Sequence, residues 1–282
     1  MRPGVAVSFL LVFGLPLAAL ALTVLISLGW APFYGVDVFP SADFYREFTD
    51  RLDFSRSVLY GLYYSLVPTV LGIIISYLIS YRIFFRHSSP TWGIYQFPLF
   101  VPYSVAGSLM ILLFVPGGIL SRIFFQFGFI ADAGEFPRIF NTPASLGIFL
   151  TVLWKQIPFC VFLILNEMSK IRPSVLRSAS ILNADRLSLS RFVVLPAIHP
   201  TLRFLFLFLF VFNFGNYEIP YILGDSSLDS LPVTVFRYFT QADPANKLTG
   251  AAGVCIAFAV SIATAVGLLG LLKIISARFY RP

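Results

Sequence analysis

The sequence predicts an all-α protein that crosses a membrane six times. Hydrophobic residues make up 58% of its 282 residues, charged residues only 12%, and the mean hydropathy is +0.85. Soluble domains carry about twice this share of charged residues, and so few charges could not cover a globule that contains 32 phenylalanines. A lipid bilayer is therefore the expected solvent. The same composition excludes intrinsic disorder, a coiled coil and a disulfide-stapled secreted scaffold.

A spanning helix needs about 20 mainly apolar residues to cross a hydrocarbon core of about 30 Å. Four uncharged stretches meet this requirement outright. Two more meet it with charges, Lys155 in one and Arg203 with Glu218 in the other. The six expected helices lie near 5–29, 58–80, 92–114, 146–166, 201–221 and 250–273. Together they predict a single transmembrane domain over residues 1–282 without a soluble appendage.

Two of these stretches allow another interpretation. Residues 205–214 largely alternate Leu and Phe, as a strand can, but a lone strand in lipid would leave its backbone unpaired, so we expect a helix. The first apolar run resembles a secretory signal with small residues at 18–21. Because it is longer than a signal core of about 7–15 residues, we expect a retained helix.

Basic residues are divided unevenly between the two sides that this topology defines. The side that holds both termini receives 12 Lys and Arg residues and two acidic residues, whereas the other side receives seven basic and 11 acidic residues. Cytoplasmic loops carry an excess of Lys and Arg. The sequence therefore predicts that both termini lie in the cytoplasm.

Motifs for catalysis, metals or cofactors are missing from the sequence. It contains no P-loop, no H-E-x-x-H, no G-x-S-x-G and no Cys/His cluster at metal-ligand spacing. We therefore expect no catalytic residue, no metal, no cofactor and no enzymatic activity, so that any energised work depends on an ion gradient or a partner chain. We attribute the net charge of +7 to membrane orientation and expect no nucleic-acid partner.

The longest cytoplasmic segment, residues 167–200, predicts two short helices joined by a sharp turn. Asn183 can end the first helix because it tolerates the left-handed conformation. Asp185 then offers an N-cap for the second helix, so that the helical loop covers 174–193. We expect Leu195-Pro196, together with Pro200, to break the chain before the fifth span.

This segment resembles the EAA motif of binding-protein-dependent type I ABC importer permeases. The motif reads Glu-Ala-Ala, three residues, Gly-Ala, and later a Phe and an aliphatic residue before Leu-Pro. Its positions are taken here by Arg177, Ser178 and Ala179, then Asn183 and Ala184, then Phe192, and finally Leu195 and Pro196. The family's Trp and Pro-Phe signature in the preceding helix is similar to Trp154, Lys155, Pro158 and Phe159. The resemblance runs from about Ser57 to the C-terminus. Arg177 reverses the charge of the family's Glu, whereas Asn183, in place of Gly, can keep the left-handed turn.

The resemblance implies the fold, location and partners of such a permease. The fold would be the type I ABC importer permease (MetI-like) fold, a multi-pass protein of the bacterial cytoplasmic (inner) membrane. Implied partners are ATP-binding cassette ATPase subunits that hydrolyse ATP, a second permease subunit (copy or paralogue), an extracytoplasmic substrate-binding protein and membrane lipid. The helical loop would couple to the ATPase through Arg177, Ser178, Ala179, Asn183, Ala184 and Asp185.

Four residues are candidates for the translocation path: Lys155, Tyr217, Glu218 and Tyr221. A lone Lys near mid-membrane must face a cavity, an acid or a carbonyl, so Lys155 can serve the helix bundle or dimer interface, contact substrate, or snorkel. Glu218 is either a solvated acid at the membrane rim or a vestibule carboxylate. A carboxylate beside tyrosines suits an ammonium group, and the sequence around Glu218 resembles the polyamine (spermidine/putrescine) branch of the family and the related iron and thiamine branches. We therefore expect a small organic cation such as a polyamine.

A gradient-driven secondary transporter or channel, which needs no ATPase, is the alternative function. Proteins of that class usually carry intramembrane charges and internal repeats. Here only Lys155 lies deep in a span, and the two halves of the sequence show no convincing repeat. The permease is therefore the favoured interpretation.

Overall fold

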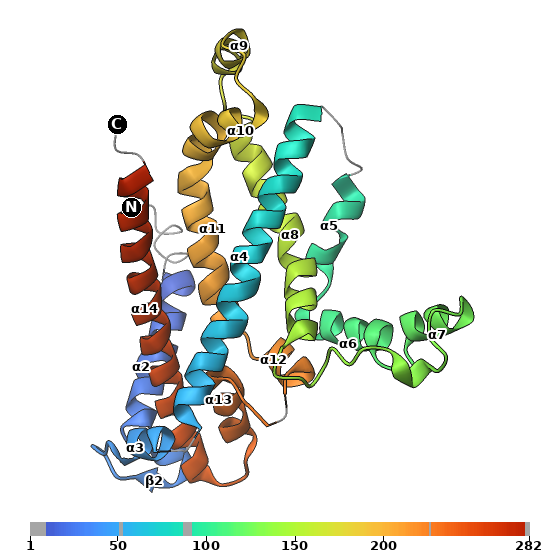
Figure 1. The fold of residues 1–282 in the computed structure, drawn as a ribbon. Coiled ribbons are helices and arrows are strands. Elements are labelled where there is room, and N and C mark those ends of the chain that lie inside the picture. Colours follow the sequence, from blue (N-terminus) through green and yellow to red (C-terminus); the bar gives the residue numbers. More distant parts are fainter. Residues whose placement is uncertain (1–9, 51–52, 87–91, 226, 280–282) are drawn as a thin grey trace. The chain divides into compact units, whose positions relative to one another are not determined.

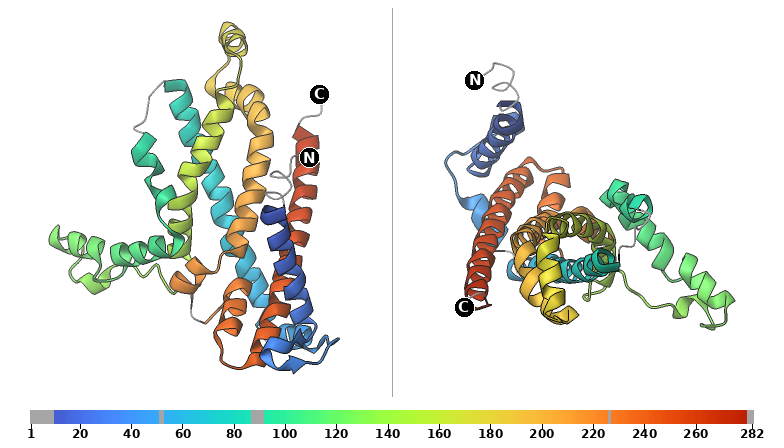
Figure 2. Two further views of the ribbon diagram at one scale, coloured as in Figure 1. Left: turned by 180° about the vertical axis from the view of Figure 1, so that it is seen from behind. Right: turned by 90° about the horizontal axis from the view of Figure 1, so that it is seen from above.

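The described chain is mainly helical. A computed structural model describes residues 10–50, 53–86, 92–225 and 227–279 (Figures 1 and 2). Within them, five helices are long and apolar enough to cross a membrane, and a sixth apolar helix, Val12–Ser27, is shorter. The expected all-α, polytopic class is confirmed.

The chain divides into two compact units. The first unit comprises Met1–Gly61 and Leu228–Thr264, and the second comprises Leu62–Ser227 and Ala265–Pro282. The single transmembrane domain expected over 1–282 stays a prediction.

The first unit combines the beginning of the chain with helices from near its end. An apolar helix is followed by a two-stranded antiparallel hairpin, a short helix and the first turns of a long one, and two later helices complete the unit (Figure 1). The elements are the π-helical turn Leu10–Gly14, α2 (Leu15–Ser27), β1 (Trp30–Ala31), the 3-10 turn Pro32–Tyr34, β2 (Val36–Asp37), α3 (Asp43–Thr49), the start of α4, α13 (Leu231–Thr240) and the first part of α14 (Pro244–Phe279).

Phe48 of α3 forms the centre of this unit. Its buried ring lies 5.7 Å from the ring of Tyr238 in α13 and 6.2 Å from the ring of Phe54, centre to centre. A Cβ on Gly253 of α14 would overlap the Phe48 ring. The bare backbone at Gly253 therefore lets α3 pack directly against α14.

Three helices form the core of the second unit: α4 (Phe54–Arg86), α8 (Leu146–Met168) and α11 (Leu195–Gly215) (Figure 1). Buried apolar side chains of α8, α11 and the turn before α11 pack against one another, and aromatic side chains of α4 cover them. The buried set is Cys160, Ile164, Met168, Val194, Ile198, Leu205 and Leu209.

The face that α4 presents to α8 consists of small residues. They recur every three or four positions, which places them on one side of the helix, and are Ser65, Thr69, Gly72, Ser76 and Ser80. Ser76 donates a hydrogen bond to the carbonyl oxygen of Ile157 at 3.3 Å, and Ser80 to that of Val161 at 3.5 Å. Small residues let membrane helices approach closely, so this row sets the contact between α4 and α8.

The third expected span, 92–114, is wrong as a single helix. The structure divides it into α5 (Trp92–Phe100) and α6 (Tyr103–Phe114), with Pro102 in an extended conformation at φ −56° and ψ 152°. Pro102 has no N–H for the carbonyl of Pro98, four residues before it, so the helix ends there. After the break, α6 and α7 (Ile119–Gln126) run across the direction of α8 (Figure 1).

The fifth expected span, 201–221, is displaced. One apolar helix, Arg186–Gly215, joins α10 (Arg186–Leu189), the π-helical turn Ser190–Val194 and α11. The break expected at Leu195-Pro196 is therefore absent, because Pro196 falls in the first turn of α11, where the missing N–H is tolerated after the wider π turn. The helix ends at Gly215, and Glu218 begins the separate helix α12 (Glu218–Leu223).

The remaining expected spans fall on observed helices. The ranges 58–80 and 146–166 lie within α4 and α8, and 250–273 lies within α14. The first range, 5–29, overlaps α2, and its residues 5–9 lie outside the described part of the chain.

Replacing Gly72 by Ala should destabilise the protein by about 1–3 kcal/mol, because overpacking costs this much. The new Cβ would overlap the side-chain amide of Gln156, which hydrogen bonds hold in place. The measurement is thermal unfolding in detergent. Gly267→Ala, where a Cβ meets nothing within 4 Å, is the matched control. Equal melting temperatures for the two variants would contradict the close contact between α4 and α8.

Candidate functional site

Lys155 of α8 lies beside the break between α5 and α6. Its Nζ donates a hydrogen bond to the carbonyl oxygen of Pro98 at 2.8 Å and another to that of Val101, and it lies 4.7 Å from the centre of the Tyr103 ring. The Pro98 carbonyl has no helical donor, because Pro102 lacks an N–H. Lys155 is 6% exposed and forms none of the ion pairs of the described residues. The structure therefore places this charge on freed backbone carbonyls.

Tyr64 of α4 bonds to the backbone where α11 gives way to α12. Its hydroxyl lies 3.3 Å from the carbonyl oxygens of both Phe214 and Asn216, at the end of α11. The side-chain carbonyl of Asn216 accepts a hydrogen bond from the backbone N–H of Ile219 at 3.2 Å, inside the first turn of α12. At this second break, side chains therefore also bond to the backbone groups.

The two breaks meet at one hollow of about 390 Å³. Tyr103, the first residue after one break, faces residues from the end of α11 and the beginning of α12, and its ring lies 5.3 Å from that of Phe212. The hollow is lined by Tyr103, Val211, Phe212, Gly215, Asn216, Tyr217 and Glu218. The structure therefore brings Tyr217 and Glu218 together, connects Lys155 to them through Tyr103, and leaves Tyr221 outside the lining.

A buried polar network next to Lys155 was not anticipated from the sequence. Asn213 of α11 donates to Thr69 of α4 at 2.9 Å and to the side-chain oxygen of Gln156 at 3.3 Å, and Gln156 donates to the carbonyl oxygen of Pro68. These bonds join α4, α8 and α11 inside an apolar core. Two amides within apolar spans were the available signal, because a buried amide needs partners.

The turn between α9 (Pro173–Ile181) and α10 has the local geometry that the sequence predicts. Asn183 adopts a positive φ of 50°, and the Asp185 carboxylate accepts a hydrogen bond from the Ser188 backbone N–H at 3.2 Å. Hydrogen bonds from the Ser188 hydroxyl and N–H hold the pKa of the Asp185 carboxyl below its ordinary value. The N–H of Ala184 bonds to the Ala179 carbonyl oxygen at 3.1 Å, so the turn is closed by its own backbone.

Large apolar side chains are uncovered around this turn. Ile181 and Leu182 are each 80% exposed and Leu187 is 74% exposed. The neighbouring motif residues Arg177, Ser178, Asn183, Ala184 and Asp185 are exposed as well, and Ala179 is half-buried. We call residues 173–189 the coupling segment. It presents an apolar surface that the described residues leave uncovered.

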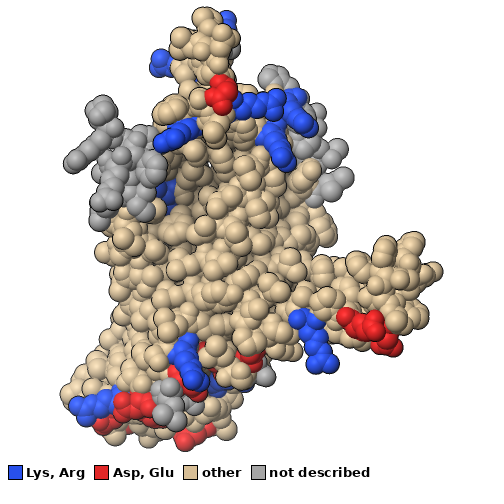
Figure 3. Space-filling view, viewed as in Figure 1, with Lys and Arg blue, Asp and Glu red and all other residues tan. Residues whose placement is uncertain are grey.

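Basic side chains are distributed unevenly along the second unit. Basic side chains gather at the end that carries α9 and α10, whereas the opposite end, at α7, carries both signs (Figure 3). The basic set near the coupling segment is Arg82, Arg86, Lys170, Arg172, Arg177, Arg186 and Arg191, with Glu167 and Asp185 as the acids. This asymmetry agrees with the positive-inside bias of the sequence.

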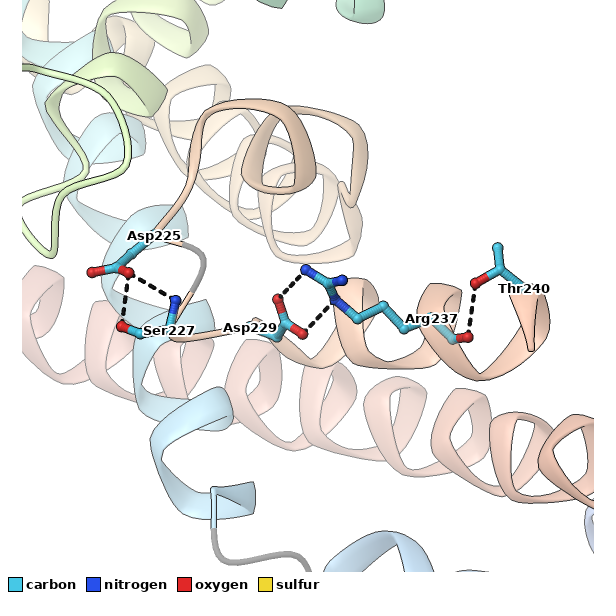
Figure 4. A network of polar contacts seen from close by, with 5 residues as sticks. All are labelled: Asp225, Ser227, Asp229, Arg237 and Thr240. Atoms are coloured by element: carbon cyan, nitrogen blue, oxygen red, sulfur yellow. Dashed lines mark hydrogen bonds and ion pairs between the residues drawn. The ribbon is translucent and has the colours of Figure 1, made fainter.

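Two acidic residues in the chain between α12 and α13 are fixed by local contacts (Figure 4). In the second unit, Asp225 accepts hydrogen bonds from the backbone N–H of Ser227 at 2.8 Å and from its hydroxyl at 2.7 Å, which lower the pKa of the Asp225 carboxyl. In the first unit, Asp229 forms a two-point ion pair with Arg237 at 2.6 and 3.2 Å. Asp225 does not belong to the lining of the hollow of Glu218. Within the described residues, no three His, Cys, Asp or Glu side chains are placed to hold a metal ion.

The arrangement of these helices is shared with solved transporters. A bacterial ABC transporter that imports the acidic polysaccharide alginate aligns with 99% of this chain and 94% of its own, with a TM-score of 0.70 and 17% identity. The chain has the ABC importer permease fold. A bacterial alginate ABC transporter in complex with an alginate pentasaccharide-bound periplasmic protein matches this permease fold with a TM-score of 0.66 and 16% identity, over 91% of this chain and 88% of its own.

Two proteins of similar sequence are described as probable ABC transporter permeases. A probable ABC transporter permease protein of Mycoplasma pneumoniae is 28% identical over 220 residues, 75% of this chain. A second, from Mycoplasma genitalium, is 31% identical over 169 residues, 57% of this chain. The chain spans 65% and 50% of the lengths of these two relatives. No family model matches the sequence.

Replacing Lys155 by Met should lower stability by about 1–3 kcal/mol, because the carbonyls of Pro98 and Val101 would lose their donor. Thermal unfolding in detergent measures this effect. Lys170→Met is the control, because Lys170 is exposed and its ion pair with Glu167 contributes about 0–1 kcal/mol. A Lys155→Met protein as stable as the control would show that Lys155 does not hold the break.

Proposed function

We propose that this chain is a permease subunit of an ATP-driven ABC importer. The observation that carries the proposal is the coupling segment, an exposed helix-turn-helix whose apolar side chains are uncovered at the basic end of a chain with the permease fold. A permease without a nucleotide-binding motif needs an ATPase partner, and this surface offers that partner a rigid element. The described similarities to ABC permeases support the same assignment.

The coupling segment would sit in a groove of a cytoplasmic ATPase subunit. Leu182 and Leu187 would supply apolar contact, and the small side chains of Ala179 and Ala184 would let the ATPase approach the turn closely. Because the Arg186–Gly215 helix continues from the turn to the hollow, movement of the ATPase would reach the hollow through one rigid element. Arg177, Ser178, Asn183 and Asp185 would shape the same contact.

The proposed assembly contains two permease subunits, as a copy or a paralogue, two ATPases and an extracytoplasmic binding protein. The periplasmic protein bound to the alginate transporter supports this assignment of partners. The basic end of the second unit supports a bacterial inner-membrane location with the coupling segment and both termini in the cytoplasm.

The hollow between the two helix breaks is the proposed part of the translocation path in this subunit. Broken helices mark substrate sites in many membrane transporters, because freed backbone groups and helix ends can bind a solute. Tyr103, Phe212, Tyr217 and Glu218 give this hollow aromatic faces and one carboxylate. That lining suits an organic cation through cation-π contact, whereas the comparisons give the polyamine assignment no support. The cationic substrate therefore stays a prediction.

Replacing Leu182 by Glu should weaken binding of the ATPase about tenfold or more, because this residue, which is 80% exposed in the chain alone, would bring a charge into an apolar contact. The measurement is co-purification of the ATPase with the full-length tagged chain. Leu182→Met keeps the apolar surface and should bind normally. Normal binding and uptake by the Leu182→Glu protein, at wild-type levels in the membrane, would overturn the coupling assignment.

Replacing Glu218 by Gln should reduce uptake of an organic cation on the order of tenfold, a change of about 1.4 kcal/mol. Uptake of radiolabelled spermidine by the complete reconstituted complex measures the effect. Glu135→Gln removes one negative charge from an exposed position outside the hollow and should leave uptake unchanged. Transport of a neutral or anionic solute that is indifferent to Glu218→Gln would remove the cation hypothesis and leave the permease assignment intact.

A further inference from the structure

A second hollow, of about 410 Å³, lies at the end of α4 beside α10. Three arginines and two aromatic residues line it, and they come from two segments about a hundred residues apart in sequence. The lining consists of Tyr81, Arg82, Phe85, Arg86 and Arg186. None of these residues contributes to the hollow at Glu218 or to the motif positions of the coupling segment.

Hydrogen bonds fasten α4 to the helix that follows the coupling turn. The Tyr81 hydroxyl donates to the carbonyl oxygen of Arg186 at 2.8 Å, and the hydroxyls of Tyr77 and Ser190 lie 2.5 Å apart. The Tyr81 and Phe85 rings lie 4.7 Å apart, centre to centre. These contacts hold the Arg186 backbone beside Tyr81 of α4, so the fold brings the three arginines to one hollow.

The cluster carries positive charge without a matching acid. Within the described residues, the ion pairs involve none of Arg82, Arg86 and Arg186. Asp185, the nearest acid in sequence, accepts the hydrogen bond that caps α10. Three guanidinium groups around one hollow repel one another unless an anion joins them, and guanidinium groups bind phosphate oxygens in a bidentate manner.

The surface of α4 on the N-terminal side of these arginines is apolar. Ile74, Leu78, Arg82 and Arg86 recur at intervals of four residues and therefore share one face of the helix. Ile74 is 50% exposed and Leu78 is 53% exposed. A single face thus offers uncovered aliphatic side chains first and guanidinium groups next. This order matches the acyl chain and the headgroup of a phospholipid.

We propose that this hollow binds the phosphate of an anionic phospholipid headgroup, with the acyl chains along Ile74 and Leu78. Arg82 and Arg86 contact the phosphate from α4, and Arg186 contacts it from α10. The bound lipid bridges the end of a membrane helix and the first residue after the coupling turn. The inference requires that α4 spans the membrane, and it is independent of transport and of the ATPase.

The test measures phosphatidylglycerol retained by the purified full-length chain in detergent, using native mass spectrometry. Loss of a charge-assisted hydrogen bond weakens binding about tenfold or more, so Arg82→Gln with Arg186→Gln should reduce retention about 100-fold. The matched control, Arg172→Gln with Arg191→Gln, removes the same charge from the same end of the unit and should retain the lipid. Equal loss in the two double variants would overturn the site in favour of diffuse attraction.

A third variant separates geometry from charge. Tyr81→Phe keeps every arginine but removes the hydroxyl that holds the Arg186 backbone, and it should also reduce retention, with thermal unfolding as the check that the chain is folded. Unchanged retention in Tyr81→Phe would contradict the built site.

Two further measurements test for another occupant of the hollow. Displacement of phosphatidylglycerol by millimolar inorganic phosphate would identify a small-anion site, and loss of ATPase binding by the Arg82/Arg186 double variant in lipid-free detergent would identify a protein contact. Either outcome overturns the lipid proposal, whereas failure of the ATPase to bind the wild-type chain bears on the proposed function alone.

Discussion

Freed backbone carbonyls are the constraint on which the second unit depends. A helix that ends among apolar side chains exposes carbonyls that lipid cannot bond, so each break requires a donor from elsewhere in the fold. Lys155 supplies it where α5 ends, and Tyr64 where α11 ends. Both donors come from the three-helix core, which explains why a cation and a phenol lie inside an apolar bundle. Side chains of the core therefore fix the positions of the helix breaks as well as the packing of the helices.

The same contacts determine where polar chemistry can occur. Because α4 presents small residues, Gln156 reaches the Pro68 carbonyl and Asn213 of α11 reaches Thr69, so three helices share one buried polar centre. The hollow with Glu218 lies where the two breaks approach each other, and Tyr103 stands between it and Lys155.

Composition predicted the membrane class, because a chain with so few charges has no other way to shield its apolar residues. The coupling turn was predictable from local chemistry, because Asn183 itself adopts the left-handed conformation and Asp185 itself caps the helix that follows. The missed break at Pro102 and the wrongly expected break at Pro196 have different reasons. Pro102 lies in an uncharged run whose hydropathy hides a missing N–H, and Pro196 suggested a break that the preceding π turn makes unnecessary. The partners of Lys155 are main-chain carbonyls far away in sequence, which no residue pattern reveals. The roles of the coupling residues and of Glu218 stay predictions.

The π-helical turn at Ser190–Val194 has a mechanical consequence. Because it continues the helix where two prolines follow, Arg186–Gly215 is one rod of 30 residues, about 45 Å long at 1.5 Å per residue. Such a rod acts as a lever. With its base at the coupling turn, a tilt of about 5° swings the Gly215 end by about 4 Å over that length, comparable with the width of a side chain. A small rotation imposed at the turn would thereby become a displacement of several ångströms at the other end of the helix.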